Sequence, residues 1–246
     1  MATTLTGCTA LVTGSTSGIG RAVARQLAVL GADIVVHGRN TDRGAKVIRD
    51  IESLGAAARF IAAGLTQPDD VRRLAQQAGP IDILINNAGV YGFAATAATD
   101  DVFFDHHVDI NLRAPYILVQ QLVPDMAARG CGAVVNLSTV AASTPARTAG
   151  VYGATKAGLE LLTKVWADEF GPSGVRVNAV AAGPTVTPGT GTMPGLVDAL
   201  AETTALGRAA DAEEIAAAVA FLASPAASYI NGAVLHATGG AVAIAP

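Results

Sequence analysis

Thr13–Gly20 constrains the fold most strongly, because it puts three glycines between an apolar run and a helical pattern. Cys8–Val12 before it predicts a buried strand, and Val23, Leu27 and Leu30 after it predict one face of a helix. At such a strand–turn–helix junction the glycines let the backbone approach a pyrophosphate, and the helix N-terminus offers free N–H groups. The segment therefore predicts a dinucleotide site, although a glycine-rich turn alone is equally compatible with an ordinary loop.

Apolar runs typical of strands alternate with helical patterns along the chain. The predicted strands are Ala10–Val12, Asp33–His37, Ala58–Ile61, Ile83–Ile85, Ala133–Leu137, Arg176–Val180 and Ala233–His236. The helical patterns between them are Asp42–Leu54, Asp69–Ala78, Phe103–Met126, Tyr152–Phe170 and Ala212–Leu222. Continuous apolar strands separated by helices indicate a parallel sheet covered on both faces, and right-handed crossovers make it doubly wound. We predict an α/β, single-domain Rossmann fold over residues 1–246, with about seven strands and a ligand site at their carboxyl ends.

Composition and charge argue against several other classes of protein. The chain has 246 residues and 51% hydrophobic content, yet every apolar run stops short of the ~20 residues that a membrane helix needs. Its start lacks the basic and apolar regions of a signal peptide, so we expect a cytoplasmic protein with no membrane partner. A net charge of −4 without a basic cluster argues against nucleic acid. Two isolated cysteines and four scattered histidines predict neither a disulfide framework nor a catalytic metal.

The end of the second predicted strand bears on the choice of cofactor. In a dinucleotide fold this end faces the adenosine ribose, where a carboxylate accepts from the 2′-hydroxyl of NAD and repels a 2′-phosphate. Gly38 stands there instead, followed by Arg39, whose guanidinium suits a phosphate. NADP(H) is therefore the predicted cofactor and NAD(H) the second choice, unless Arg39 only begins a solvated turn.

Tyr152 and Lys156 lie four residues apart at the start of a predicted helix and so share one helical face. A tyrosine with an unperturbed pKa near ~10 is a poor acid–base catalyst at neutral pH, but a neighbouring ammonium favours the phenolate and lowers that pKa. The pattern Tyr-x-x-x-Lys also occurs by chance on helix surfaces. It carries weight only together with other motifs.

Asn111 lies within the predicted helix Phe103–Met126, and Pro115 follows four residues later. Proline has no N–H, so the carbonyl of Asn111 loses its helical partner and the helix should kink. The freed carbonyl can bind a water molecule. On the residues alone, this feature is a structural kink.

Three motifs in order carry a resemblance to a known family. They are Thr-Gly-x-x-x-Gly-Ile-Gly at Thr13–Gly20, Asn-Asn-Ala-Gly at Asn86–Gly89, and Tyr-x-x-x-Lys at Tyr152–Lys156. The chain from Leu5 to about Gly240 resembles the classical short-chain dehydrogenase/reductase family. The resemblance implies an NAD(P)-dependent oxidoreductase that acts on a small carbonyl or alcohol substrate. It also implies a homodimer or homotetramer, with the helices Phe103–Met126 and Tyr152–Phe170 paired across a two-fold axis and the tail from Ala233 in a second interface.

The resemblance assigns roles residue by residue. The implied cofactor-binding residues are Gly14, Ser15, Thr16, Ser17, Gly18, Ile19, Gly20, Arg39, Leu65, Asn87, Ala88, Gly89, Tyr152, Lys156, Gly183 and Thr187. The implied catalytic residues are Asn111, Thr139, Tyr152 and Lys156. Thr139 would polarise the substrate oxygen and Tyr152 would give it a proton. Lys156 would lower the tyrosine pKa and hold the nicotinamide ribose, and Asn111 would anchor a water chain that relays protons.

Several positions depart from the family pattern. The catalytic serine normally lies thirteen residues before the tyrosine, where this chain has Thr139. Ser138 is its neighbour, but adjacent strand residues point to opposite faces, so only one of them can serve, and we assign the role to Thr139. Gly64 replaces an Asp that usually binds the adenine amine, which leaves backbone contacts at Leu65. Ala182 and Thr238 stand where the family has Pro and Asp.

The substrate cannot be read from the sequence, and specificity is expected in Tyr91–Ala95, Thr144–Ala149 and a lid. Pro188–Gly195, rich in Pro, Gly, Thr and Met, begins this lid, which we place at about 188–205. We predict an NADP(H)-dependent carbonyl reductase or alcohol dehydrogenase. One alternative is a reductase of 3-oxoacyl thioesters. Its acidic acyl carrier protein would need a basic docking surface, and the sequence offers only scattered arginines such as Arg113 and Arg129. The other alternative is a catalytically weak, nucleotide-responsive binding protein. A hydrolase is disfavoured, because Gly14–Gly18 has threonine where a nucleophile elbow has serine.

Overall fold

Strand β1 (Thr9–Val12) shows why the sheet needs a helical layer on each side. Ala10 and Val12 point into one apolar cluster, whereas Leu11 points into the other. All three side chains are fully buried. Alternating residues of a strand face opposite sides, so a strand that is apolar at every position must be covered twice.

The computed structural model describes residues 4–193 and 195–241. The other strands are β2 (Asp33–Gly38), β3 (Ala58–Ala62), β4 (Ile83–Asn86), β5 (Gly132–Thr139), β6 (Val175–Ala182), β7 (Thr185–Val186), β8 (Ala210–Asp211) and β9 (Val234–Ala237). The helices are α1 (Gly18–Val29), α2 (Thr41–Glu52), α3 (Pro68–Ala78), α4 (Asp101–Val108), α5 (Ala114–Arg129), α6 (Gly150–Phe170), α7 (Leu196–Ala201) and α8 (Ala212–Ala223).

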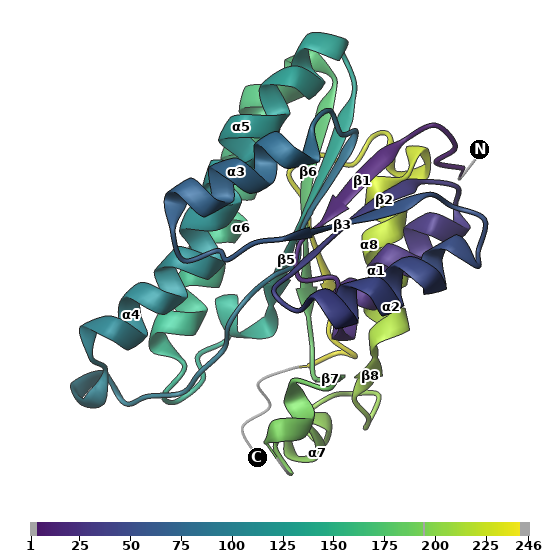
Figure 1. Cartoon of the computed structure of the whole chain (residues 1–246). Helices are drawn as coiled ribbons and strands as arrows, with labels where there is room; N and C mark the ends of the chain where they lie inside the picture. The colour runs from purple at the N-terminus through teal and green to yellow at the C-terminus, as the bar shows by residue number, and fades with distance from the viewer. Residues whose placement is uncertain (1–3, 194, 242–246) are drawn as a thin grey trace.

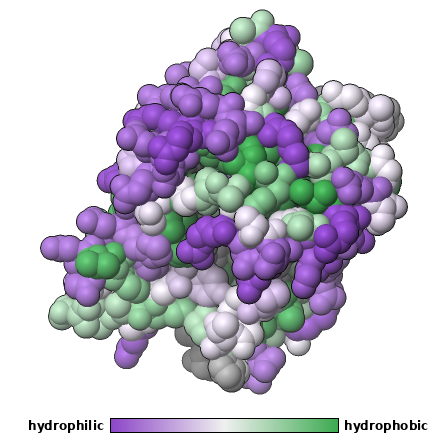
Figure 2. Space-filling model, viewed as in Figure 1, coloured by the Kyte–Doolittle hydropathy of each residue, from purple (hydrophilic) through white to green (hydrophobic). Residues whose placement is uncertain are grey.

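Seven parallel strands form the central sheet in the order β3-β2-β1-β4-β5-β6-β9, which confirms the predicted doubly wound α/β fold. Helices α1, α2 and α8 cover one face, and α3, α5 and α6 cover the other (Figure 1). In the same view, hydrophilic side chains cover most of the surface, with apolar atoms exposed in its middle (Figure 2). Strand β1 pairs with both β2 and β4, so the strand order reverses beside β1 and opens a ligand crevice at the carboxyl ends.

The long helix predicted at Phe103–Met126 is interrupted. Helix α4 and helix α5 are joined by a π-helical turn at Asp109–Arg113, in which the N–H of Ala114 bonds to the carbonyl of Asp109. The missing N–H of Pro115 is the local cause, because a wider turn re-pairs part of the ladder that proline breaks. The predicted distortion is therefore present, and its form is a π-turn.

Other details differ from the sequence prediction. The short sheet β7–β8 and helix α7 are additional elements, and α7 lies within the segment predicted as a lid. On α6, which the resemblance places at an interface, Trp166 is 3% exposed and belongs to the core, whereas Leu161 and Val165 are exposed. Within the described residues, no helix is both long enough and apolar enough to cross a bilayer. The tail predicted as an interface includes residues 242–246, which lie outside the described residues.

Candidate active site

The glycine-rich turn packs directly against the segment after β4. Gly14 and Gly18 have φ of 66° and 53°, a region that residues with a Cβ rarely adopt. A Cβ on Gly14 would lie 3.0 Å from Ala88 Cα, and one on Gly20 would lie 2.5 Å from the carbonyl oxygen of Gly14. The side-chain amide of Asn87 donates to the Thr13 carbonyl oxygen at 2.8 Å, which fixes the two segments together. These glycines therefore allow the turn to pack closely against the segment after β4 and to lead into the N-terminus of α1, where free N–H groups suit a pyrophosphate.

His37 braces this turn from the end of β2. Its Nδ1 accepts from the N–H of Gly14 at 3.1 Å, so its Nε2 carries the proton and donates to the Ala63 carbonyl oxygen at 3.2 Å. The ring is 2% exposed, and burial lowers the pKa of His37 to about 4. Ser15 belongs to the same support, because its hydroxyl donates to Val12 and accepts from the N–H of His37. Ser15, which was predicted to bind the cofactor, is fully buried and lines neither of the two hollows described below. Its hydroxyl supports the turn from within.

The side chain of Thr16 occupies the space beside Gly38. A Cβ on Gly38 would lie 2.6 Å from Thr16 Cγ2 and 2.9 Å from Thr16 Oγ1. An acidic side chain at position 38 therefore has no room while Thr16 is present. Arg39 follows as an exposed residue at the strand end.

Beside Thr16, Ser17 and Gly18 lies a hollow of about 770 Å³ with many cationic side chains. The cations on its walls are Arg21, Arg25, Arg43, Lys46 and Arg49. Asp50 pairs with Arg21 and lies 3.8 Å from Arg25, while Asp211 and Glu213 also reach the lining. The sequence analysis singled out only Arg39; the i, i+3 and i, i+4 spacing of these cations on α1 and α2 was the available signal.

Asn111 is fully buried in the π-turn and joins two other segments. Its amide nitrogen donates to the Val90 carbonyl at 2.9 Å and to Thr155 Oγ1 at 3.2 Å, and its amide oxygen accepts from the N–H of Val90 at 2.9 Å. A Cβ on Gly89 would lie 3.2 Å from this oxygen and 3.3 Å from Lys156 Nζ. The π-turn thus brings Asn111 close to the lysine with which the resemblance connects it.

Ser138 and Thr139 diverge at the end of β5, as strand alternation predicts. Ser138 Oγ donates to Glu160 Oε1 on α6 at 2.6 Å. Thr139 instead has its hydroxyl on the side of Tyr152, where it acts to lower the tyrosine pKa, and its Oγ1 accepts from the N–H of Ala141 at 3.4 Å. The hydroxyl on the side of Tyr152 is therefore that of Thr139, the residue chosen from the thirteen-residue spacing.

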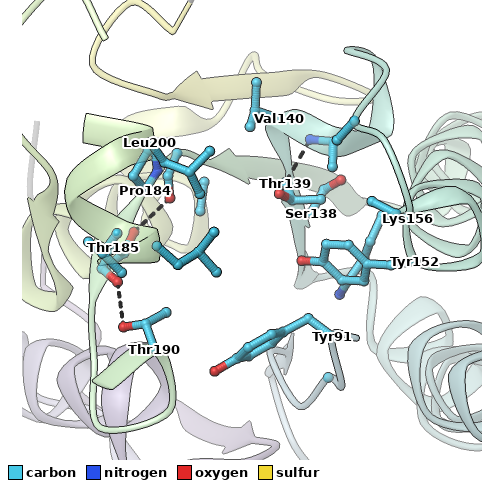
Figure 3. A pocket seen from close by; sticks show the side chains of 18 of the residues that line it. Tyr91, Ser138, Thr139, Val140, Tyr152, Lys156, Pro184, Thr185, Thr190 and Leu200 are labelled. Atoms are coloured by element: carbon cyan, nitrogen blue, oxygen red, sulfur yellow. Dashed lines mark hydrogen bonds between the residues drawn. The ribbon is translucent and has the colours of Figure 1, made fainter. Parts of the chain in front are cut away.

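Tyr152 and Lys156 project from α6 into the same cavity (Figure 3). Burial raises the pKa of Tyr152, and the Thr139 hydroxyl opposes this rise only in part. The sequence analysis expected a neighbouring ammonium to lower this pKa, and the structure gives the opposite direction, because the effect of burial is larger than that of the Thr139 hydroxyl. Burial likewise lowers the pKa of Lys156 to about 8, and its ammonium donates to the Leu137 carbonyl oxygen at 2.7 Å.

A cavity of about 680 Å³ extends from the glycine-rich turn past Tyr152 to α7. The three segments predicted to set specificity all contribute to its wall, through Tyr91, through Thr144–Ala149 and through Thr190. Tyr91 lies edge-on to Tyr152, with ring centroids 6.5 Å apart, and faces the lid region across the cavity (Figure 3). Residues predicted to be catalytic, to bind the cofactor and to set specificity thus line one cavity.

Comparison with known proteins agrees with this geometry. The family model described as enoyl-(acyl carrier protein) reductase matches residues 14–242. The chain belongs to the short-chain dehydrogenase/reductase family. It is 35% identical to the 3-oxoacyl-[acyl-carrier-protein] reductase FabG of Staphylococcus epidermidis, over 94% of this chain and 97% of that protein.

Solved structures of this family superimpose closely on the chain. A short chain dehydrogenase/reductase family protein has a TM-score of 0.91 at 49% identity, covering 98% of each chain. L-sorbose reductase of Gluconobacter frateurii, solved with NADPH and L-sorbose, has a TM-score of 0.92 at 30% identity, covering 100% of each chain. This short-chain dehydrogenase/reductase is therefore an oxidoreductase.

The remaining predicted residues are distributed around the cavity. Ile19, Asn87, Gly89, Gly183 and Thr187 line it, whereas Leu65 is 9% exposed and packs in the core. The segment predicted as a lid contains α7, which adds Leu196, Val197 and Leu200 to the wall, but the sequence analysis did not predict that this part is helical. Their 196/197/200 spacing is the signal of a short amphipathic helix, which the surrounding glycines and threonines obscured.

Proposed function

We propose that this short-chain dehydrogenase/reductase transfers a hydride between a nicotinamide cofactor, preferably NADP(H), and a carbonyl or secondary alcohol substrate. The observation that carries the proposal is the Tyr152 side chain, which lines the same cavity as Thr139 and has buried Lys156 on the next helical turn. The glycine-rich turn beside these groups fits the pyrophosphate of the cofactor, because it leads with positive φ at Gly14 and Gly18 into the N-terminus of α1, where free N–H groups suit an anion. When bound, the cofactor supplies or accepts the hydride.

The protein's own groups handle the proton and the substrate oxygen. Thr139 and Tyr152 form a pair of hydroxyls that can hold a carbonyl oxygen and stabilise the negative charge that develops on it. The raised pKa keeps the Tyr152 phenol protonated at neutral pH, so it can donate its proton during reduction. The ammonium of Lys156 is buried and stabilises the negative charge that develops on the substrate oxygen. Asn111 holds the loop after β4 in place by accepting from the N–H of Val90.

NADP(H) is preferred in this proposal for two reasons. Position 38 has no room for a carboxylate, and Arg39 with the five cations of the neighbouring hollow surrounds the turn with positive charge. We expect NADPH to bind more tightly than NADH, and Arg39→Ala to remove most of the difference. A charge-assisted phosphate contact is worth ~1.5–3 kcal/mol, or roughly ten- to a hundred-fold in affinity. Equal affinities in the unmutated protein would contradict the preference.

Turnover of NADPH with a panel of carbonyl compounds tests the reaction itself. Thr139→Ser should retain activity, whereas Thr139→Val, which keeps the shape and deletes the hydroxyl, should lose about a hundred- to a thousand-fold in kcat. Ser138→Ala is the matched control and should change little, because that hydroxyl bonds to Glu160. A dead Ser138→Ala with an active Thr139→Val would reverse the assignment. Absence of turnover that depends on Tyr152 would favour the nucleotide-responsive binding protein instead.

A 3-oxoacyl-thioester reductase is the second candidate. It is supported by the matching family model and by the FabG of Staphylococcus epidermidis. Comparing kcat/KM for a 3-oxoacyl thioester with that for the free ketone of equal chain length separates the two. A large advantage for the thioester would favour this narrower activity.

A further inference from the structure

The part of the cavity between Tyr152 and the lid is lined mainly by hydrocarbon. Its walls come from the loop after β4, the end of β5 and the short helix α7. The side chains that bring this hydrocarbon are Phe93, Val140, Leu196, Val197 and Leu200, together with the ring of Tyr91, which also carries a hydroxyl. In Figure 3, Leu200 and Val140 stand on the side opposite Tyr91, so apolar groups bound the space from more than one direction.

Most of the threonines in the wall have no hydroxyl hydrogen to offer a ligand. Thr185 Oγ1 donates to the Gly183 carbonyl oxygen at 2.9 Å, and Thr203 Oγ1 donates to the Leu200 carbonyl oxygen at 2.7 Å. Thr190 Oγ1 donates to the Thr185 carbonyl oxygen at 3.0 Å. These threonines add methyl groups to the cavity, while their hydroxyl hydrogens serve the protein backbone.

Charged groups are equally sparse around this space. No Asp or Glu belongs to the cavity lining within the described residues, and its cations are Lys156 and Arg147. Lys156 is buried and bonded to Leu137, and Arg147 is exposed on the segment before α6. A polyol needs a partner for each hydroxyl that it buries, and carboxylates and free amides are the usual acceptors. This wall supplies few such partners beyond the catalytic hydroxyls.

We infer that the substrate is a ketone, or its secondary alcohol, whose body is hydrocarbon rather than polyol. The inference rests on the proposed function, since it names the substrate class of the same site. The reacting oxygen lies at Thr139 and Tyr152, and the carbon skeleton lies along Val140, Tyr91 and α7. This separates the chain from the Gluconobacter frateurii relative, which binds L-sorbose.

A matched pair of substrates tests the inference directly. Steady-state NADPH oxidation is measured with 2-hexanone and with L-sorbose, which have equal numbers of carbons. We expect kcat/KM to be at least a hundred-fold higher for the hydrocarbon ketone. Along the series from 2-butanone to 2-octanone, each added methylene should raise kcat/KM about four-fold until the cavity is filled.

A variant of the wall shows whether α7 provides the apolar contact. Leu200→Asn keeps the branching and the number of side-chain heavy atoms but is polar. It should reduce the gain in kcat/KM along the chain-length series several-fold while leaving the affinity for NADPH unchanged. Leu206→Asn is the control, because Leu206 is an exposed leucine beyond α7 and outside the cavity lining. It should leave the whole series as in the unmutated protein.

The possible outcomes separate the two levels of the proposal. A higher kcat/KM for L-sorbose, or a series with no dependence on chain length, overturns the inference and leaves the hydride-transfer function intact. No Tyr152-dependent turnover of either substrate class, with NADPH still bound, overturns the proposed function and the inference with it. A steep series that Leu200→Asn flattens and Leu206→Asn does not supports both.

Discussion

Lowering the pH below 6.5 should destabilise the folded chain through His37. In the fold this ring is 2% exposed and neutral, accepting from Gly14 and donating to Ala63. Protonation would put a second N–H on Nδ1 against the Gly14 N–H, and would place a charge in a buried site. The unfolded chain has neither constraint, so His37 binds a proton more strongly in the unfolded state than in the fold.

The size of the effect follows from the two pKa values of His37. The pKa is about 4 in the fold and 6.5 in the unfolded chain, a difference of about 2.5 units. At 1.36 kcal/mol per unit, the free energy of unfolding loses up to about 3.4 kcal/mol as the pH falls from above 6.5 to below 4. Between pH 7.5 and pH 5 the loss amounts to about 2 kcal/mol.

Urea denaturation at pH 7.5 and pH 5, at one protein concentration, measures this loss. His37→Gln cannot titrate, so its free energy of unfolding should fall by about 2 kcal/mol less between the two pH values than that of the unmutated protein. His106→Gln is the control, because His106 is exposed on α4 and should leave the slope unchanged. Parallel losses in His37→Gln and the unmutated protein would refute the reasoning, as would an NMR titration of His37 with a midpoint near 6.5.

Three further predictions concern catalysis, cofactor choice and assembly. Because the Lys156 pKa is about 8, kcat/KM for reduction should fall as the pH rises through 8. Lys156→Arg stays charged over this range, so its pH–rate profile should lack that inflection. Gly38→Asp alone should weaken binding of both cofactors because of Thr16, whereas Gly38→Asp with Thr16→Gly should shift the NADPH/NADH affinity ratio roughly ten- to a hundred-fold toward NADH in fluorescence titrations. Light scattering at micromolar concentration should show a dimer or tetramer rather than a 24.6 kDa monomer, because Leu161 and Val165 expose apolar surface on α6. Replacing both residues with Gln should shift the equilibrium toward the monomer.

The order of the elements and the location of the site could be predicted from the sequence. The glycine-rich turn, the apolar strands and the Tyr152–Lys156 spacing each depend on residues close together in the chain, so turn chemistry and periodicity are enough to read them. The choice of Thr139 over Ser138 rests on the same kind of local rule, since neighbouring residues of a strand must face opposite ways.

Only the tertiary structure decided what surrounds those groups. His37 braces Gly14, Thr16 fills the space at Gly38, and the cations of α1 and α2 surround one hollow, because segments distant in sequence meet at the carboxyl ends of the sheet. Burial has the same origin and overturned the expected pKa of Tyr152, since desolvation depends on every element packed around the phenol. A sequence pattern specifies which groups are near one another along a helix or strand, but not how much water the assembled fold leaves around them.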